Sequence, residues 1–389
     1  MTLKCDVLVV GAGPAGSSAA RAAAISGAKT IIIDKKKEIG VPVQCAESIS
    51  KYLIPLLPFK IPSEQLLWET EGIQFWADDS LVEKTGDFWS ACAVNRKNFD
   101  RWLAQTAVDA GAKLLTSAEL VDLKVINEEV IENAVVKTLD GEKVIDPKVV
   151  IAADGVKSTV LNCLPIAVKE EGNIGHILSF EMKNLILEKP QLDQLFIGDF
   201  APGTYGYIFP KSGTAANVGV GTLFSKEKLD EKYLEFLEIP HVKKQLQDGI
   251  NVRSKSGSVP FRCITDSWVY GNTLLVGDSA AQNIKPFVEG ILPGIICGDI
   301  AGQVAAQHIK SDMSLSNYVK NVQDKLGDIF KESNRIADIM YDLSLIKDRK
   351  KHLLRLGVSA NVFSLNDIDR LKNEDYITLK KRLEAENKN

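Results

Sequence analysis

The N-terminal region has the residue pattern of a strand, a glycine-rich turn, a helix and a second strand. Apolar residues lead into Gly11, Gly13 and Gly16, and a second apolar run ends in Asp34. In a dinucleotide-binding unit, Gly11 permits a tight turn, Gly13 leaves the backbone open to a pyrophosphate, and Gly16 lets the helix approach the sheet. Asp34 would accept hydrogen bonds from the adenosine ribose. The order of these parts predicts a dinucleotide site, for which a glycine-rich turn alone would be weak evidence.

The helix after this turn would direct its N-terminus at the phosphates. Its unpaired N–H groups and positive dipole end bind anions without a basic side chain. Alanines give the helix a small surface and a high helical propensity, and Gly27 is placed to end it. Ala15, in the first turn, and Lys35, after the ribose-binding acid, complete this part of the predicted site.

The composition excludes several classes of protein. The chain has 389 residues, of which 45% are hydrophobic, so it can bury a large core and divide into about two or three domains. A net charge of −4 gives no electrostatic reason to expect nucleic acid binding. Six scattered cysteines without a CxxC pair predict a reduced protein with no bound metal.

The ends and the hydropathy of the chain bear on its location. The first predicted strand begins within five residues of the N-terminus, which leaves no room for a signal peptide. No apolar run approaches the ~20 residues of a membrane-spanning helix. We therefore expect a cytoplasmic protein whose only possible membrane contact is peripheral, at the inner face of the cell membrane.

The remaining chain alternates between regions with strand patterns and regions with helix patterns. The predicted elements are strands within 68–89, a helix at 98–110, a hairpin meander at 118–150, a short strand at 149–153, strands at 176–262 with a helix near 226–237, a strand at 273–276, a helix at 290–308 and further helices after 314. Because the pattern of the first unit returns after residue 264, the nucleotide-binding domain is predicted to be discontinuous.

The fold class that follows is α/β and α+β. We expect a Rossmann-type domain with a three-layer, mostly parallel sheet, an inserted antiparallel-sheet substrate domain and a C-terminal helical region. The predicted boundaries are 1–60, 93–175 and 265–312 for the nucleotide-binding domain, 61–92 and 176–264 for the substrate domain, and 313–389 for the helical region.

Three further motifs place polar residues where they could contact the same cofactor. Arg96 precedes an amphipathic helix and could clamp a pyrophosphate or orient a flavin edge. Asp154 and Gly155 end one apolar strand, and Gly277 and Asp278 end another, where a carboxylate could bind ribityl hydroxyls. Taken singly, an arginine at position 96 is more often a solvated residue at a helix start, and the 154–155 pair is better explained as an ordinary turn. Their joint occurrence favours a flavin pocket.

The order of these motifs, with GxGxxG first and Gly-Asp about 260 residues later, resembles the flavoprotein hydroxylase superfamily. The resemblance covers most of residues 1–310 and implies the p-hydroxybenzoate hydroxylase fold with FAD as the cofactor. The helix that begins at Gly290 and Ile291 would then face the flavin N1 and C2 carbonyl. The chain has no second GxGxxG for NAD(P)H. We therefore expect an external electron donor, either ferredoxin or an NAD(P)H system.

Two motifs narrow the resemblance to the geranylgeranyl reductases. The first is YGYIFP followed by GVG, which resembles the YxWxFP…GxG signature with a tyrosine in place of the tryptophan. It implies an aromatic wall for a long isoprenoid chain and a close-lying backbone that leaves the chain a channel. The alternative interpretation is two hairpin strands with core aromatic residues. The predicted substrate-binding residues are Tyr205, Tyr207, Phe209, Pro210, Gly219 and Gly221.

The second motif, PVQCAE at 42–47, resembles the Cys-and-Glu loop of these reductases, which is expected to reach the flavin. It adds Cys45 and Ala46 to the predicted cofactor contacts. An isolated alkene that takes a hydride from reduced FAD also needs a proton. An unperturbed thiol (pKa ≈ 8.5) is about 97% protonated at pH 7, and a carboxyl group (pKa ≈ 4.3) about 0.2%.

Cys45 is hypothesised to deliver the proton or to gate the redox step, with inert packing as the alternative. Glu47, the other predicted catalytic residue, would need burial that raises its pKa by roughly 3 units to serve as the acid.

Two features leave alternatives open. Glu289 lies where the resembling family has a glycine-rich stretch; an inward carboxylate would disfavour an anionic reduced flavin, whereas an outward one would be solvated. Residues 343–356, LSLIKDRKKHLLRL, are either a solvated helix over a core or a peripheral membrane contact.

The resemblance implies an FAD-dependent prenyl reductase that saturates isolated double bonds of geranylgeranyl chains on a membrane lipid such as a digeranylgeranylglycerophospholipid. Its partners would be the prenylated lipid and the electron donor. The alternatives are an FAD-dependent monooxygenase or halogenase on the same fold, although the chain lacks a WxWxIP-like halogenase motif, and a non-enzymatic flavin electron-transfer protein.

Overall fold

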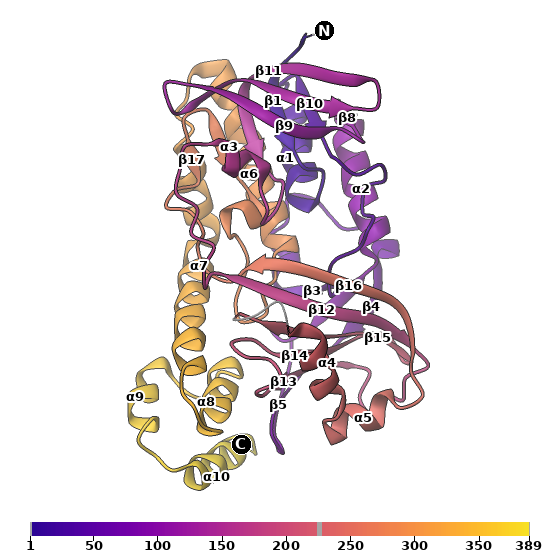
Figure 1. The fold of residues 1–389 in the computed structure, drawn as a ribbon, viewed down its shortest axis with the longest axis vertical. Helices are drawn as coiled ribbons and strands as arrows, with labels where there is room; N and C mark the ends of the chain where they lie inside the picture. The colour runs from indigo at the N-terminus through magenta and orange to yellow at the C-terminus, as the bar shows by residue number, and fades with distance from the viewer. Residues whose placement is uncertain (1, 224–227, 389) are drawn as a thin grey trace.

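The first sheet gathers strands from three separated parts of the chain. The computed structural model describes residues 2–223 and 228–388 (Figure 1). The sheet follows the order β17-β18-β11-β1-β2-β8, and β10 and β9 continue from β11. From β18 to β8 each strand is parallel to the next on this path, whereas β17 is antiparallel to β18. The strands are β1 (Thr2–Val10), β2 (Thr30–Ile33), β8 (Lys113–Leu115), β9 (Glu119–Ile126), β10 (Val130–Thr138), β11 (Gly141–Ala152), β17 (Val269–Tyr270) and β18 (Thr273–Leu275).

Helices cover one face of the parallel strands. The β9-β10 hairpin, which pairs with residues 141–145 of β11, covers the other face together with a short helix. The helical face carries α1 (Pro14–Ile25), α2 (Arg96–Asp109) and α6 (Ile291–Ser311), which share one hydrophobic core with the sheet. The opposite core contains residues of β9, β10 and α3 (Thr159–Cys163). The result is the three-layer, Rossmann-type arrangement that the sequence predicts.

The second sheet is mostly antiparallel and lies at the other end of the molecule (Figure 1). Its order is β16-β12-β15-β14-β13-β5-β6, with β13 and β5 as a parallel pair. Its strands are β5 (Gly72–Ala77), β6 (Ser80–Thr85), β12 (Ile174–Lys183), β13 (Leu192–Ile197), β14 (Gly206–Ser212), β15 (Ala215–Thr222) and β16 (Ile250–Pro260). A small third sheet joins β3 (Ser48–Ser50), β7 (Ala91–Val94) and β4 (Leu66–Thr70).

The second sheet is covered on both faces. Helices α4 (Leu229–Leu237) and α5 (Pro240–Leu246) pack on one face, and the C-terminal helices pack on the other. The long helix α7 (Asn317–Ser344) runs along one side of the molecule from the first sheet towards these helices (Figure 1). The last elements are α8 (Lys350–Ser359), α9 (Ile368–Leu371) and α10 (Tyr376–Glu386). In the described part of the chain, no helix is both long and apolar enough to cross a membrane.

Several sequence predictions need correction. Helix α4 begins at Leu229, and the predicted start near residue 226 lies outside the described residues; α5 was not predicted at all. The short strand predicted at 149–153 is the end of the much longer β11. The strands predicted within 68–89 divide, since β5 and β6 join the second sheet whereas β4 joins the small one.

The C-terminal run 343–356 is neither one helix nor an exposed apolar face. Helix α7 ends at Ser344, and α8 begins at Lys350. Leu353, Leu354 and Leu356 are completely buried against the second sheet. The apolar side chains of α8 are therefore not available for the membrane contact considered for this run.

Candidate functional site

The glycine-rich turn joins β1 to α1 with close backbone contacts. Gly11 has a φ of +99°, and a Cβ there would lie 2.3 Å from the Ala153 carbonyl oxygen. A Cβ on Gly16 would lie 1.8 Å from the Gly11 carbonyl oxygen, so a side chain is excluded at both positions. Above Gly13 no atom lies within 4 Å of such a Cβ. The turn therefore leaves open backbone beside the N-terminus of α1, which fits a pyrophosphate.

Asp34 is held at the end of β2 by two backbone groups. The Ala12 N–H donates to its Oδ2 (2.9 Å), and the Lys36 N–H donates to its Oδ1 (2.8 Å). These bonds fix the carboxylate beside the glycine turn, and each oxygen keeps a further lone pair for a ribose hydroxyl. Lys35, which follows Asp34, is exposed.

The Gly277–Asp278 motif lies against the first motif, although the two are far apart in sequence. A Cβ on Gly277 would lie 3.0 Å from the Cβ of Ala15, and one on Gly290 would lie 3.1 Å from Asp278 Oδ1. Ile291, the first residue of α6, is buried. The structure therefore brings Ala15, the 277–278 motif and the start of α6 together.

Arg96 begins α2 and is oriented by an acid that the sequence analysis missed. Its Nε and Nη2 donate to Asp100 Oδ1 and Oδ2 at 2.7 and 3.0 Å, and its guanidinium also interacts with Cys45. Burial raises the pKa of Asp278, and the positive charge of Arg96 opposes part of that rise. The four-residue spacing between Arg96 and Asp100 is the signal that could have revealed the pair.

Asp154 has one buried oxygen that accepts no hydrogen bond from the described residues. The Val160 N–H donates to its Oδ2 (3.1 Å), whereas Oδ1 is buried without a partner. Burial raises the pKa of this carboxyl group. Its Cα would lie only 3.0 Å from a Cβ on Gly11, and Gly155 follows with a φ of +84°. An unpaired acceptor next to the glycine turn fits a hydroxyl donor of a bound dinucleotide.

The Cys45 loop ends in Glu47, which is almost fully buried. The backbone N–H of Glu47 donates to the Cys45 sulfur (3.2 Å). Its carboxylate accepts hydrogen bonds from Lys211 Nζ (2.7 Å), Lys255 Nζ (2.7 Å) and the Arg96 N–H (3.0 Å). The loop therefore lies between the start of α2 and the second sheet.

The condition for Glu47 as a proton donor is not met. Burial raises the pKa of this carboxyl group, as the sequence analysis required, but Lys255 and Lys211 lower it further, to about 2. Glu47 is therefore an anion at neutral pH. The lysines could not be predicted, because they are more than 160 residues away in sequence.

The aromatic residues of β14 are core residues on the side of the second sheet that faces α8. Tyr207 stacks on Phe209 with ring centroids 4.6 Å apart, and the Tyr205 hydroxyl donates to the Phe287 carbonyl oxygen (2.7 Å). Ala46 packs on the same cluster, and Tyr207 interacts electrostatically with Cys45. Pro210 is buried at a register shift between β14 and β15. The structure thus places the aromatic strand beside the Cys45 loop.

The predicted channel over the two glycines of β15 is wrong. A Cβ on Gly219 would lie 2.6 Å from the Tyr207 ring, and one on Gly221 would lie 2.7 Å from Thr204 Oγ1. The space above both glycines is therefore filled by the protein's own side chains.

Glu289 points into the protein, so the solvated alternative is wrong. The Ser50 N–H donates to its Oε1 (3.1 Å), and the Ser50 hydroxyl donates to its Oε2. Burial raises the pKa of Glu289 to about 7. Glu289 immediately precedes Gly290, the N-cap residue of α6.

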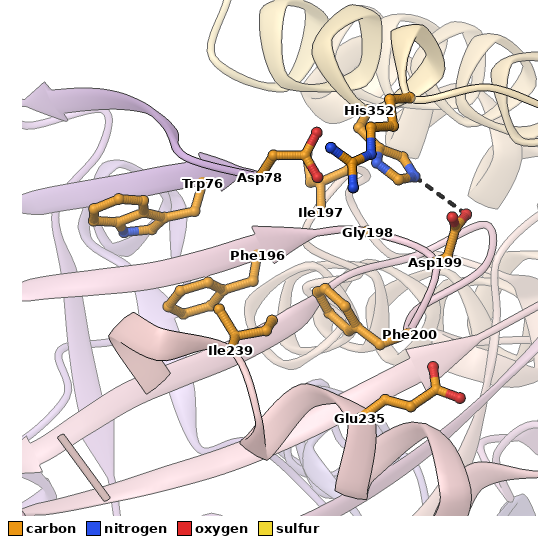
Figure 2. Close-up of a pocket in the computed structure, with 11 residues that line it drawn as sticks. Trp76, Asp78, Phe196, Ile197, Gly198, Asp199, Phe200, Glu235, Ile239 and His352 are labelled. Carbon is orange, nitrogen blue, oxygen red and sulfur yellow. Dashed lines mark hydrogen bonds and ion pairs between the residues drawn. The ribbon is translucent and has the colours of Figure 1, made fainter. Parts of the chain in front are cut away.

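A cavity of about 310 Å³ lies outside this site, between the ends of β5 and β13, α4 and the start of α8. Figure 2 shows Trp76, Phe196, Phe200 and Ile239 along its apolar side and the Asp199–His352 contact at its rim. None of the predicted site residues lines this cavity.

Two known protein families match parts of this chain. The "FAD dependent oxidoreductase" family matches residues 6–156, which contain the glycine turn, Asp34, Arg96 and Asp154. The "geranylgeranyl reductase catalytic domain" family matches residues 174–258, which span β12 to β16. The protein is an FAD-dependent oxidoreductase.

Two curated relatives identify the family of this protein. The chain is 37% identical, over 73% of its length and 72% of the relative, to a digeranylgeranylglycerophospholipid reductase of Methanocaldococcus jannaschii. It is 33% identical, over 88% of each chain, to digeranylgeranylglycerophospholipid reductase 2 of Methanosphaera stadtmanae. The chain therefore belongs to the geranylgeranyl reductase family, whose reaction is the FAD-dependent reduction of prenyl groups.

Solved structures agree on the fold. A geranylgeranyl bacteriochlorophyll reductase-like protein of Thermoplasma acidophilum superposes with a TM-score of 0.82, at 26% identity, over 99% of this chain and 100% of that one. A myxobacterial chondrochloren halogenase superposes with a TM-score of 0.74 over 99% of this chain and 96% of that one. At 15% identity the halogenase shows a shared fold only.

Proposed function

We propose that this reductase saturates isolated double bonds of geranylgeranyl chains carried by a membrane lipid of the digeranylgeranylglycerophospholipid type. The observation that carries the proposal is the contact between the Cys45 loop and the sheet that matches the reductase catalytic domain. The side chains of Asn217 and Lys255 donate to the carbonyl oxygens of Ala46 and Cys45. The names of the curated relatives support the lipid class.

Each part of the proposed site has a separate task. The open backbone at Gly13 and the N-terminus of α1 bind the pyrophosphate, and Asp34 binds the ribose. Arg96, Asp278 and the start of α6 orient the flavin end, and Asp154 accepts a hydrogen bond from the cofactor. Bound FAD, once reduced, supplies a hydride for one alkene carbon.

The proton for the other alkene carbon comes from the Cys45 thiol in this proposal. Glu47 is already deprotonated at neutral pH and cannot supply it. Tyr205 and the β14 residues Tyr207 and Phe209 would contact the prenyl chain. The thiolate left behind takes up a proton from solvent before the next turnover.

Electrons reach the site from an external donor, which we propose to be ferredoxin or an NAD(P)H system. The support is the absence from the sequence of a second nucleotide fingerprint. Access to a lipid substrate calls for peripheral contact with the inner face of the cell membrane by a cytoplasmic protein. For the domains we propose the boundaries predicted from the sequence: residues 1–60, 93–175 and 265–312 bind FAD, residues 61–92 and 176–264 bind the substrate, and residues 313–389 form the helical region.

Anaerobic incubation tests this function. The chemically reduced protein is mixed with a panel of geranylgeranyl lipids: diether phospholipids, menaquinones and prenylated chlorophyll precursors. Mass spectrometry should show hydrogens added in pairs to the diether phospholipid. No mass gain in any lipid would contradict prenyl reduction, and oxygen consumption coupled to NAD(P)H oxidation would favour a monooxygenase.

The role of Cys45 has its own test. The Cys45→Ser variant replaces the thiol with a much weaker acid, so alkene reduction should fall by on the order of 10²-fold or more. The FAD content and the melting temperature are measured in parallel. Full alkene reduction by a variant with unchanged FAD content would remove Cys45 as the proton donor.

A further inference from the structure

Lys255 of β16 donates three hydrogen bonds through its ammonium group, two to the Cys45 loop and one to Asn217 of β15. Its Nζ donates to the Cys45 carbonyl oxygen (3.2 Å), Glu47 Oε2 (2.7 Å) and Asn217 Oδ1 (2.7 Å). The side chain is almost fully buried. A buried lysine whose three donors all have acceptors is fixed in position.

Neighbouring strands of the same sheet add to this contact. Asn217 of β15 is completely buried and donates through Nδ2 to the Ala46 carbonyl oxygen (2.7 Å) and Glu47 Oε2 (3.2 Å). The Nζ of Lys211, on β14, lies 2.7 Å from Glu47 Oε2 and 3.4 Å from Oε1 of Glu181, which is on β12. The two lysines and two glutamates together carry no net charge.

The loop holds Glu47 in an unfavourable backbone conformation beside these partners. Glu47 has a φ of +63°, in the left-handed region that is unfavourable for a residue with a side chain. The backbone N–H of this residue donates to the Cys45 sulfur. Replacing a whole buried ion pair with apolar residues is often neutral or stabilising, so stability alone does not account for the presence of this network.

We propose that Lys255 and Asn217 are positioning residues for Cys45. They tie two consecutive carbonyl groups of the cysteine loop to the sheet that carries the aromatic strand. The thiol is thereby fixed relative to both the prenyl chain and the start of α2. This inference rests on the proposed function, because it assigns a purpose to the position of the thiol.

Loss of either residue should release the loop while leaving the FAD site and the aromatic strand in place. Lys255→Met and Asn217→Ala should react faster with iodoacetamide at Cys45, by on the order of tenfold, because the thiol becomes more accessible. In prenyl reduction kcat should fall by on the order of 10²-fold with KM within about twofold, because a 1 Å misplacement has effects of that size.

The experiment compares these two variants with wild type and with Lys244→Met. Lys244 is an exposed α5 residue that pairs with Glu188 on the surface and has no role at the Cys45 loop in this proposal, so its variant should match wild type. Alkylation of Cys45 is followed by peptide mass spectrometry under native conditions, with FAD content and melting temperature as controls for folding. Asn217→Ala, a smaller change, carries the test if Lys255→Met does not fold.

Wild-type alkylation and wild-type kcat in a folded variant would overturn the proposal. A rise in KM with unchanged kcat would also overturn it, because that result indicates substrate binding instead of proton delivery. The alkylation measurement needs no lipid. If wild-type protein reduces no prenyl lipid, the proposed function fails, while the positioning of Cys45 is still decided by the alkylation rates.

Discussion

Two glutamates in the site are similarly buried but have opposite electrostatic surroundings. Glu47 lies between two lysine ammonium groups, and its pKa falls to about 2. Glu289 is hydrogen-bonded to Ser50, and burial raises its pKa to about 7. Burial alone therefore does not predict the charge of a carboxyl group. Its pKa also depends on nearby lysine ammonium groups, which can come from residues distant in the sequence.

The two glutamates should affect stability with opposite dependence on pH. Glu47 stabilises the fold fully above its unfolded pKa of about 4.5, and that stabilisation is lost as pH falls towards about 2. Urea unfolding of wild type and Glu47→Gln at several pH values should therefore show a stability difference that shrinks below about pH 4.5. A difference that stays constant from pH 6 to the lowest usable pH would contradict the ion-pair account.

Ionisation of Glu289 should lower the stability of the fold as pH rises. Its folded pKa lies above the unfolded value, so wild type loses stability as pH rises from about 4.5 through about 7. Glu289→Gln cannot ionise and should become more stable relative to wild type over that range, by on the order of 3 kcal/mol at most. Parallel stability curves for the two proteins would mean that Glu289 is solvated.

Gly219 should be intolerant of a side chain. A Cβ there would lie 2.5 Å from the Ser179 Cβ and 2.6 Å from the Tyr207 ring, both on packed strands. Gly219→Ala should lower the free energy of unfolding by about 1–3 kcal/mol, measured by urea unfolding. Gly213→Ala is the control, because no atom lies within 4 Å of a Cβ there. Equal stability of the two variants would contradict the close packing of Tyr207 over β15.

At the scale of elements, the contact between α1 and α6 builds the cofactor site. Cβ atoms on Gly298 and Gly302 would each lie 2.2 Å from a backbone carbonyl oxygen of α1. These glycines let the two helices approach closely, which brings the Gly277–Asp278 motif against Ala15. The partner of these two glycines could not be predicted from the sequence, since it depends on tertiary packing.

Gly298→Ala should therefore separate α1 from α6 and reduce both FAD content and stability. We expect a loss of about 1–3 kcal/mol of unfolding free energy, measured on the apoprotein, together with lower flavin absorbance per protein. Gly327→Ala in α7 is the matched control, because the nearest contact of its Cβ is an ordinary 3.6 Å and helical alanine is favoured over glycine. Unchanged FAD content in Gly298→Ala would contradict this role.

The sequence predicted local elements better than their partners. The first βαβ unit, the 118–150 meander and α6 followed from local periodicity and turn residues. Helix α5 was missed because it is only seven residues long and follows α4 with little separation. The pairing of β4 with β7, and the lysines around Glu47, depend on contacts that no local pattern encodes.

At the scale of the whole molecule, the Cys45 loop connects the two large sheets. It follows the Asp34 region of the nucleotide-binding domain and is held by side chains of the second sheet. A hydride site and a prenyl-binding surface would therefore meet at one loop. In the proposed function, the loop and the second sheet would supply the chemistry specific to prenyl reduction, because a fold alone does not determine a reaction.

The central claim is that prenyl double bonds accept the electrons of protein-bound FAD. The most direct measurement is the absorbance of the oxidised flavin after anaerobic reduction of the protein and addition of a geranylgeranyl diether phospholipid. The account predicts that this absorbance returns without oxygen, with one double bond reduced per flavin reoxidised. A flavin that stays reduced until oxygen is admitted would contradict it.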